Sequence, residues 1–138
     1  MIVDCNSCHA SNRLPAARLG DKAKCAKCKE PLLPISRPIA LQSTADFDEL
    51  IRNAKADVLV DFWAAWCGPC RMVAPELEKV ASHRVGRTVV AKVDTEALPD
   101  LAARYGIRSI PTMIVFRGGA EAKRISGAMP AAQIEAQL

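Results

Sequence analysis

Two cysteines separated by two residues, Cys67 and Cys70, are the side chains with the clearest chemistry in this sequence. They follow an apolar run at residues 58–63 and open a helical pattern, so they lie at a predicted junction of strand and helix. Cysteines at this spacing can close a small disulfide ring, and the first sulfur would meet the unpaired N–H groups and the dipole of the helix. Such a thiol is partly ionised near neutral pH and attacks other disulfides. The spacing therefore indicates thiol–disulfide exchange.

The two residues inside this motif support that interpretation. Gly68 allows the close approach of a partner chain, and Pro69 sets the helical φ where no N–H donor is needed. The alternative is a structural disulfide or a pair of buried thiols. The strand before the motif and the helix after it argue against that alternative.

The remaining four cysteines form two further pairs with the same spacing. Cys5 and Cys8 are separated from Cys25 and Cys28 by sixteen residues, which is the spacing of a four-cysteine zinc ribbon. The sequence predicts one tetrahedral Zn²⁺ there, and a structural zinc contributes about 10 kcal/mol to folding. Two alternatives are haem attachment, because His9 follows Cys8, and a pair of disulfides. We expect His9 to be exposed and not to coordinate the metal.

The net charge of +4 lies in the N-terminal part of the chain. Residues 1–38 hold seven Lys or Arg and three acids, whereas residues 39–138 hold twelve of each. A basic segment can bind nucleic acid, but it can also offset the charge of −2 on four thiolates with one zinc ion. The segment has no aromatic residue for base stacking, so we favour the zinc account and do not expect a nucleic-acid partner. The second function hypothesis is nevertheless a docking or nucleic-acid-binding zinc module carried on the larger part.

The composition limits the class of protein. Half of the 138 residues are apolar and a quarter are charged, which favours a soluble globular chain. No apolar run is long enough to span a bilayer, and the N-terminus lacks the pattern of a signal peptide. Six cysteines without an export signal indicate reduced thiols, a metal site or catalysis, so we expect a cytoplasmic protein with no membrane partner.

The hydrophobic pattern divides the chain in two. Pro31, Pro34 and Pro38 mark a seam, so we expect a zinc-binding segment at residues 1–38 and a second domain at 39–138. The second part has the predicted order βαβαβαββα, which indicates an α/β fold with a central mixed sheet and helices on both faces. The predicted strands cover residues 39–42, 58–63, 88–93, 112–116 and about 122–125, and the helices cover about 43–54, 67–83, 98–105 and 133–138.

These motifs resemble the thioredoxin family. Residues 62–70, Phe-Trp-Ala-Ala-Trp-Cys-Gly-Pro-Cys, look like its active-site signature, and Ile110-Pro111-Thr112 looks like its segment with a cis proline. Each N-terminal pair, Cys5 with Cys8 and Cys25 with Cys28, would form a zinc knuckle, a short turn that points two sulfurs at one metal ion. With these two knuckles added, the chain is similar to the zinc-containing thioredoxin 2 subfamily. The resemblance implies a thioredoxin fold preceded by a zinc-ribbon-like segment, a redox-active disulfide, and a role in electron transport and cell redox homeostasis.

The resemblance also implies a role for each site residue. Cys67 would attack a disulfide of a target protein, Cys70 would resolve the mixed disulfide, and Asp61 would accept the proton of Cys70. An aspartate in an apolar strand needs a partner or a raised pKa, and the alternative is a core carboxylate bonded to Lys92. A NADPH-dependent thioredoxin reductase would restore the dithiol, and no bound organic cofactor is expected. Trp63 would pack under the site, and an apolar groove for the substrate would be formed by Trp66, Gly68, Pro69, Ile110, Pro111, Gly127 and Ala128.

Two points stay open in the sequence. The chain stops at Leu138, so its last helix is expected to be shorter than in the family. The zinc site is either a closed structural site or a redox sensor whose oxidised thiolates release the metal.

Overall fold

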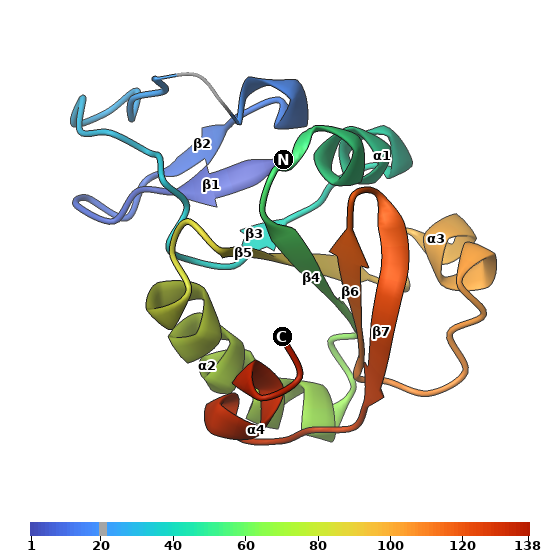
Figure 1. Cartoon of the computed structure of the whole chain (residues 1–138). Helices are drawn as coiled ribbons and strands as arrows, with labels where there is room; N and C mark the ends of the chain where they lie inside the picture. The colour runs from blue at the N-terminus through green and yellow to red at the C-terminus, as the bar shows by residue number, and fades with distance from the viewer. Residues whose placement is uncertain (20–21) are drawn as a thin grey trace.

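The central feature of the computed structural model, which describes residues 1–19 and 22–138, is one mixed β-sheet (Figure 1). Within the described residues it has seven strands in the order β2-β1-β3-β5-β4-β6-β7. The pairs β3–β5 and β4–β5 are parallel, and the remaining pairs are antiparallel. The strands are β1 (Ile2–Asp4), β2 (Ser11–Arg13), β3 (Ile39–Ala40), β4 (Asp57–Trp63), β5 (Thr88–Asp94), β6 (Thr112–Arg117) and β7 (Ala120–Ser126).

Helices cover both faces of this sheet (Figure 1). They are the short 3-10 helix η1 (Ala16–Arg18) and the α-helices α1 (Thr44–Asn53), α2 (Gly68–His83), α3 (Pro99–Arg104) and α4 (Ala131–Glu135). From residue 39 the observed order is βαβαβαββα, which confirms the predicted α/β architecture. Among the described residues, no helix is both long enough and apolar enough to cross a membrane.

Strand β4 separates two apolar clusters because successive side chains point to opposite faces. Val58, Val60 and Phe62 belong to the cluster on the side of α1 and α3. Leu59 belongs to the cluster on the side of α2 and α4. Asp61 alternates in the same way as Leu59, so the strand places its carboxylate on the face covered by α2.

Most predicted boundaries lie within one residue of the observed ones, and boundaries of β3, β7 and α4 differ by two or more. Strand β3 has two residues instead of four, although Leu41 N–H still donates to the Lys92 carbonyl at 3.0 Å. Helix α4 begins at Ala131, two residues before its predicted start, because Pro130 provides the extended residue from which the helix begins. It is short, as expected, and Ala131 and Ile134 are its buried residues.

The N-terminal segment belongs to the same sheet, which the sequence did not indicate. Strand β1 pairs with β2 and with β3, where Ile2 lies opposite Ala40. The segment has no separate core, because its buried apolar side chains join one cluster with those of the following domain. The members of this cluster from the two parts include Met1, Val3, Leu14, Leu32 and Ile35 on one side and Ile39, Phe47 and Leu50 on the other.

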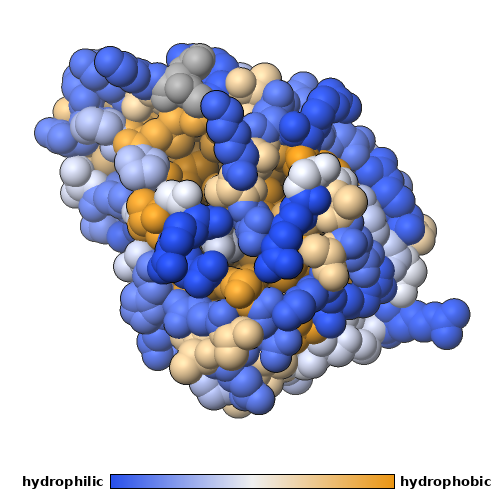
Figure 2. All heavy atoms as spheres, in the orientation of Figure 1, coloured by the Kyte–Doolittle hydropathy of each residue, from blue (hydrophilic) through white to orange (hydrophobic). Residues whose placement is uncertain are grey.

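A shallow apolar cavity marks the seam between the two parts. It has a volume of about 260 Å³ and is lined by Leu33 and Pro34 of the N-terminal segment together with Ala54, Ala56 and Val89. Figure 2 shows apolar atoms in hollows of the visible face, surrounded by hydrophilic side chains. The seam is therefore partly apolar, and the Met1 ammonium also pairs with Asp46 of α1 across it at 3.0 Å.

The shared core predicts that the two parts unfold together. Leu14 is 2% exposed, and replacing such a side chain with alanine costs about 2–4 kcal/mol through the cavity that remains. We expect Leu14→Ala to lower the stability reported by Trp63 and Trp66, which lie in the other part. Urea unfolding followed by tryptophan fluorescence measures this. An unchanged midpoint, with the loss confined to the N-terminal segment, would contradict a shared core.

Candidate active site and metal centre

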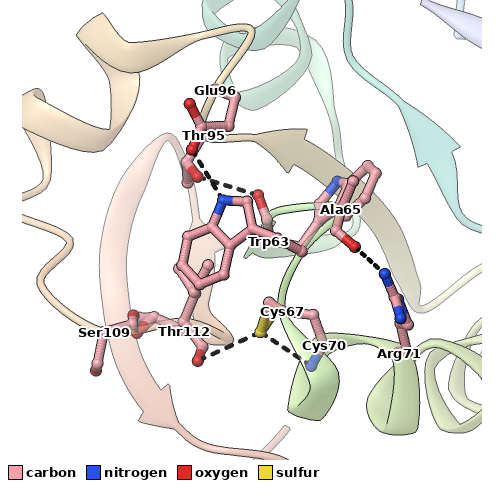
Figure 3. Close-up of a disulfide and its surroundings, with 11 residues drawn as sticks. Trp63, Ala65, Cys67, Cys70, Arg71, Thr95, Glu96, Ser109 and Thr112 are labelled. Atoms are coloured by element: carbon pink, nitrogen blue, oxygen red, sulfur yellow. Dashed lines mark hydrogen bonds between the residues drawn. A yellow bond between two sulfur atoms is a disulfide. The ribbon is translucent and has the colours of Figure 1, made fainter.

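Cys67 and Cys70 form a disulfide at the N-terminus of α2 (Figure 3). Their Cα atoms are 5.3 Å apart, and each residue is 4% exposed. Cys67 is the N-cap residue of the helix, and its Sγ accepts a hydrogen bond of 3.2 Å from the Cys70 N–H. Unpaired N–H groups and the dipole of this 16-residue helix favour negative charge at the position of the Cys67 sulfur.

The turn between β4 and α2 fixes the position of Cys67. Its N–H donates to the Ala64 carbonyl at 3.1 Å, and the Arg71 guanidinium donates to the Ala65 carbonyl at 2.6 Å (Figure 3). Pro69 lies in the first turn of the helix, as the sequence predicted. A Cβ at Gly68 would meet no atom of the described chain within 4 Å, so this glycine leaves the surface beside the sulfur open.

The segment before β6 faces the disulfide. The Ile110–Pro111 bond is cis, as predicted, and the Ile110 carbonyl oxygen lies 3.7 Å from Cys67 Sγ. Gly127 N–H donates to the Pro111 carbonyl at 2.9 Å, which brings the residues after β7 beside this segment. Of the predicted groove residues, these contacts join Ile110, Pro111 and Gly127 around Cys67, and Ala128 is exposed next to them.

Two exposed apolar side chains lie close to the disulfide in the sequence. Trp66 is 68% exposed, and its indole N–H donates to Glu96 at 2.9 Å. Met72, on the first turns of α2, is 71% exposed. Glu96 was not among the predicted site residues, because its contact with Trp66 joins positions 30 apart in the chain. Met72 was not among them either, although it lies only two residues after Cys70 in the sequence. Trp63 is half-buried and packs against the cluster of Ala64, Cys67 and Cys70, which agrees with its predicted place.

Asp61 is buried without a hydrogen bond. It is 0% exposed, and neither carboxylate oxygen has a partner among the described residues. It lies opposite Lys92 of β5 and Met113 of β6. The Lys92 ammonium instead lies 4.8 Å from the centre of the Trp63 ring, so the alternative of an Asp61 carboxylate bonded to Lys92 is not observed.

Burial raises the pKa of Asp61 from 3.8 to about 7, and the charge of Lys92 opposes this only in part. A carboxyl group with this pKa exchanges protons near neutral pH, where thiols of lowered pKa do the same. Since Asp61 and α2 share one face of the sheet, the arrangement offers a proton acceptor on the side of the disulfide.

The four N-terminal cysteines form a compact cluster. Their sulfurs all lie within 4.8 Å of one another, and all four are free thiols. The distances are 3.5 Å between Cys5 and Cys28 and 3.6 Å between Cys8 and Cys25. A tetrahedron with Zn–S bonds of about 2.3 Å has sulfurs about 3.8 Å apart, so the donor type and spacing fit one zinc ion.

The two knuckles have matching backbone geometry. Cys5 and Cys25 each accept a hydrogen bond of 3.0 Å at the carbonyl oxygen, from the N–H of His9 and of Lys29. These two donors have φ of 63° and 69°, a left-handed conformation that nothing in the sequence indicates for these non-glycine residues. His9 is exposed and outside the cysteine cluster, as predicted.

Comparisons with known proteins assign both parts of the chain. The fold and the dithiol at a helix N-terminus define a protein-disulfide oxidoreductase. The thioredoxin family model matches residues 38–138, and a model described as "Thioredoxin 2, N-terminal" matches residues 5–30. The chain belongs to the thioredoxin family, and its N-terminal match places it with the thioredoxin 2 group.

Relatives support this assignment over the whole length. Thioredoxin C-3 of Corynebacterium nephridii is 42% identical over 138 residues, covering all of this chain and 93% of that protein. A thioredoxin of Alicyclobacillus acidocaldarius is 49% identical over 94 residues, covering 68% of this chain and 89% of that protein. Among solved structures, a mutant thioredoxin from Halobacterium salinarum matches with a TM-score of 0.69 and 30% identity, covering 74% of this chain and 88% of that one.

The raised pKa of Asp61 predicts that replacing this residue with asparagine stabilises the fold, and that the increase in stability depends on pH. The Asp61 carboxyl keeps its proton up to about pH 7 in the folded protein, whereas it loses the proton near pH 4 in the unfolded chain. The free energy of unfolding therefore falls as pH rises from about 4 to 7, and the whole destabilisation is present above pH 7. Asp61→Asn removes this charge. We expect its gain in unfolding free energy to be about 2–3 kcal/mol larger at pH 8 than at pH 5. Denaturant unfolding of the oxidised proteins at both pH values measures this, and an equal gain at both would show that the pKa is not raised.

Proposed function

We propose that this protein reduces disulfide bonds of target proteins by dithiol–disulfide exchange through Cys67 and Cys70. The observation that supports this most directly is the pair of cysteines at the N-terminus of α2, with Cys67 as the N-cap residue. In this proposal the Cys67 thiolate attacks one sulfur of the target disulfide. A bond forms between the two sulfurs, and the other target sulfur leaves as a thiolate.

Cys70 completes the reaction. Its thiol gives a proton to Asp61, and the resulting thiolate attacks Cys67 Sγ, which breaks the mixed disulfide and releases the reduced target. Support comes from the burial of Asp61 without a partner and from its pKa near 7. An uncommitted carboxylate on the α2 side of the sheet can accept this proton without breaking an existing hydrogen bond.

The site surface offers a place for the target. Trp66, directly before Cys67, and Met72, two residues after Cys70, are exposed apolar side chains, whereas the disulfide itself is almost buried. An extended segment of the target would lie between Trp66 and the residues around Ile110, Pro111, Gly127 and Ala128. The open surface at Gly68 and Pro69 would let the target sulfur approach Cys67.

We further propose that a NADPH-dependent thioredoxin reductase restores the dithiol, and that the protein works in the reducing cytoplasm. The family assignment supports the first point, because members of this family exchange electrons with disulfide partners. The Gly-Pro pair between the cysteines resembles that of the reducing members of the fold. The four free N-terminal thiols agree with a reducing compartment.

For the N-terminal segment, we propose a domain boundary near residue 38 and one zinc ion held by Cys5, Cys8, Cys25 and Cys28. The metal would supply folding free energy to residues 1–38 and take no part in the thiol exchange. Support comes from the cluster of four sulfurs. It also comes from the sheet order, because β1 and β2 are separated by β3 and β5 from β4, the strand that leads to Cys67. This geometry favours a structural role over the alternative of an independent docking module.

The proposed division of labour predicts opposite phenotypes for the two cysteines. Cys67→Ser removes the attacking thiolate, so reduction of insulin with reductase and NADPH should fall below about one tenth of the wild-type rate. Cys70→Ser keeps the first step but removes the second, so it should trap targets as mixed disulfides visible on non-reducing gels. If Cys67→Ser trapped targets instead, the two roles would have to be exchanged.

The zinc proposal predicts one Zn²⁺ per chain by elemental analysis, and loss of that metal in Cys8→Ser. Deleting residues 1–37 should lower the melting temperature, because the shared apolar core loses part of its cover. It should leave insulin reduction within about twofold of the full chain, since in the described part of the chain the hydrogen bonds of Cys67 all go to residues after position 38. A folded deletion protein without activity would show that the segment takes part in docking or catalysis.

A further inference from the structure

The side-chain amide of Asn12 joins the two zinc knuckles. Asn12 lies on β2, is 8% exposed, and makes three hydrogen bonds. Its Nδ2 donates to the Ala10 carbonyl at 3.1 Å and to Cys25 Sγ at 3.5 Å. Its Oδ1 accepts from the Ala26 N–H at 2.9 Å. One side chain therefore connects the loop that closes the first knuckle with a sulfur and a backbone amide of the second.

The backbones of the two knuckles match, so Cys5 of the first knuckle can be compared directly with Cys25 of the second. Cys5 and Cys25 occupy equivalent places, both are 0% exposed, and their N–H groups donate to the carbonyls of Ala10 and Glu30 at 2.9 and 2.8 Å. Within the part of the chain that the structure describes, only Cys25 receives a hydrogen bond from a side-chain amide. The sulfurs of Cys5 and Cys25 therefore have different hydrogen-bond donors, although both are fully buried: Cys5 Sγ accepts from the Ser7 N–H at 3.4 Å, whereas Cys25 Sγ accepts from the Asn12 amide.

We propose that Asn12 is the positioning residue of the zinc site, which slows zinc loss and makes Cys25 the least reactive of its four thiolates. The inference rests on the zinc site proposed above. A donated N–H stabilises negative charge on the sulfur and fixes its direction, as outer partners of metal ligands generally do. The same amide also holds Ala26, the residue after Cys25, so it keeps the second knuckle in place against the first.

The exposure of the other three cysteines predicts the order in which they react with an electrophile. Cys8 and Cys28 are half-buried, whereas Cys5 and Cys25 are fully buried. An electrophile should therefore reach Cys8 or Cys28 first, then Cys5, and should reach Cys25 last. With N-ethylmaleimide, each event forms one S–C bond to the maleimide double bond, and the adjacent carbon takes a proton from water.

Two variants separate the roles of the amide. Asn12→Asp has nearly the same shape and keeps an oxygen to accept from Ala26, but it loses both N–H donors, to Cys25 and to the Ala10 carbonyl, and adds a negative charge beside the sulfur. Asn12→Leu has a similar volume and loses all three hydrogen bonds. The matched control is Asn6→Ala, which removes an exposed amide of the first knuckle that donates to Ser36 and not to a cysteine.

The full-length zinc protein is mixed with the indicator 4-(2-pyridylazo)resorcinol, and the rate of zinc transfer is followed by absorbance. We expect transfer to be about 10–100-fold faster in Asn12→Asp and Asn12→Leu, and unchanged within about twofold in Asn6→Ala. In the cobalt-substituted protein, the thiolate charge-transfer bands should shift in Asn12→Asp but not in Asn6→Ala. Mass spectrometry after brief N-ethylmaleimide treatment should find Cys25 protected in the wild type and modified early in Asn12→Asp.

Transfer at the wild-type rate in both Asn12 variants would overturn the proposal. Faster transfer with unchanged cobalt bands and an unchanged order of modification would also overturn it, because it would show general loosening of the segment instead of an effect on Cys25. If Asn12→Leu does not hold zinc, Asn12→Asp alone decides. Metal analysis of the wild type keeps the two questions apart, because a protein without zinc would refute the zinc site itself.

Discussion

The rest of the structure depends on the pairing of strand β4 with β5 on one side and β6 on the other. Seven consecutive residues of β4 pair with β5 in parallel register, and five of them pair with β6. Every backbone amide and carbonyl of a strand in this position is used inside the sheet, so its end is fixed in space. Cys67 follows four residues after the end of β4, and the Trp63 carbonyl accepts from the Thr95 N–H at 2.9 Å. The position of Cys67 is therefore set by a strand that is paired on both sides.

The same strand carries the group that the fold accommodates least well. A carboxylate with no hydrogen-bond partner in an apolar sheet costs free energy, and a hydrophobic residue at that position would be expected to pack better. The cost is smallest at low pH, where the group is protonated, and largest where it is ionised. Retaining such a residue beside α2 is understandable if the group must change its protonation state during turnover.

The sequence was sufficient for the parts of the structure that depend on local pattern. The apolar run of β4 and the helix opened by Pro69 each lie where their periodicity or turn chemistry indicated. The cysteine spacing also identified both clusters. The cis bond before Pro111 followed from the family resemblance, because nothing in its immediate neighbours favours that isomer.

What could not be predicted depends on segments that are distant along the chain. Strands β1 and β2 have three residues each and little alternation, so no periodic signal separates them from loops. The contact of Trp66 with Glu96 joins residues 30 positions apart, and the contacts of Asn12 span two knuckles. Positive φ at His9 and Lys29 is likewise imposed by the closing of each knuckle, not by the preference of these residues.

Strands β1 and β2 also change which strand forms one edge of the sheet and exposes unpaired backbone groups. Without them β3 would be an edge strand with unpaired N–H and C=O groups, to which a strand of another molecule could add. With them the border is β2, only three residues long and ending at the charged Arg13. At the opposite border, β7 turns Glu121, Lys123 and Arg124 to solvent. Both edges of the sheet therefore oppose the addition of a further strand, which disfavours self-association along the sheet.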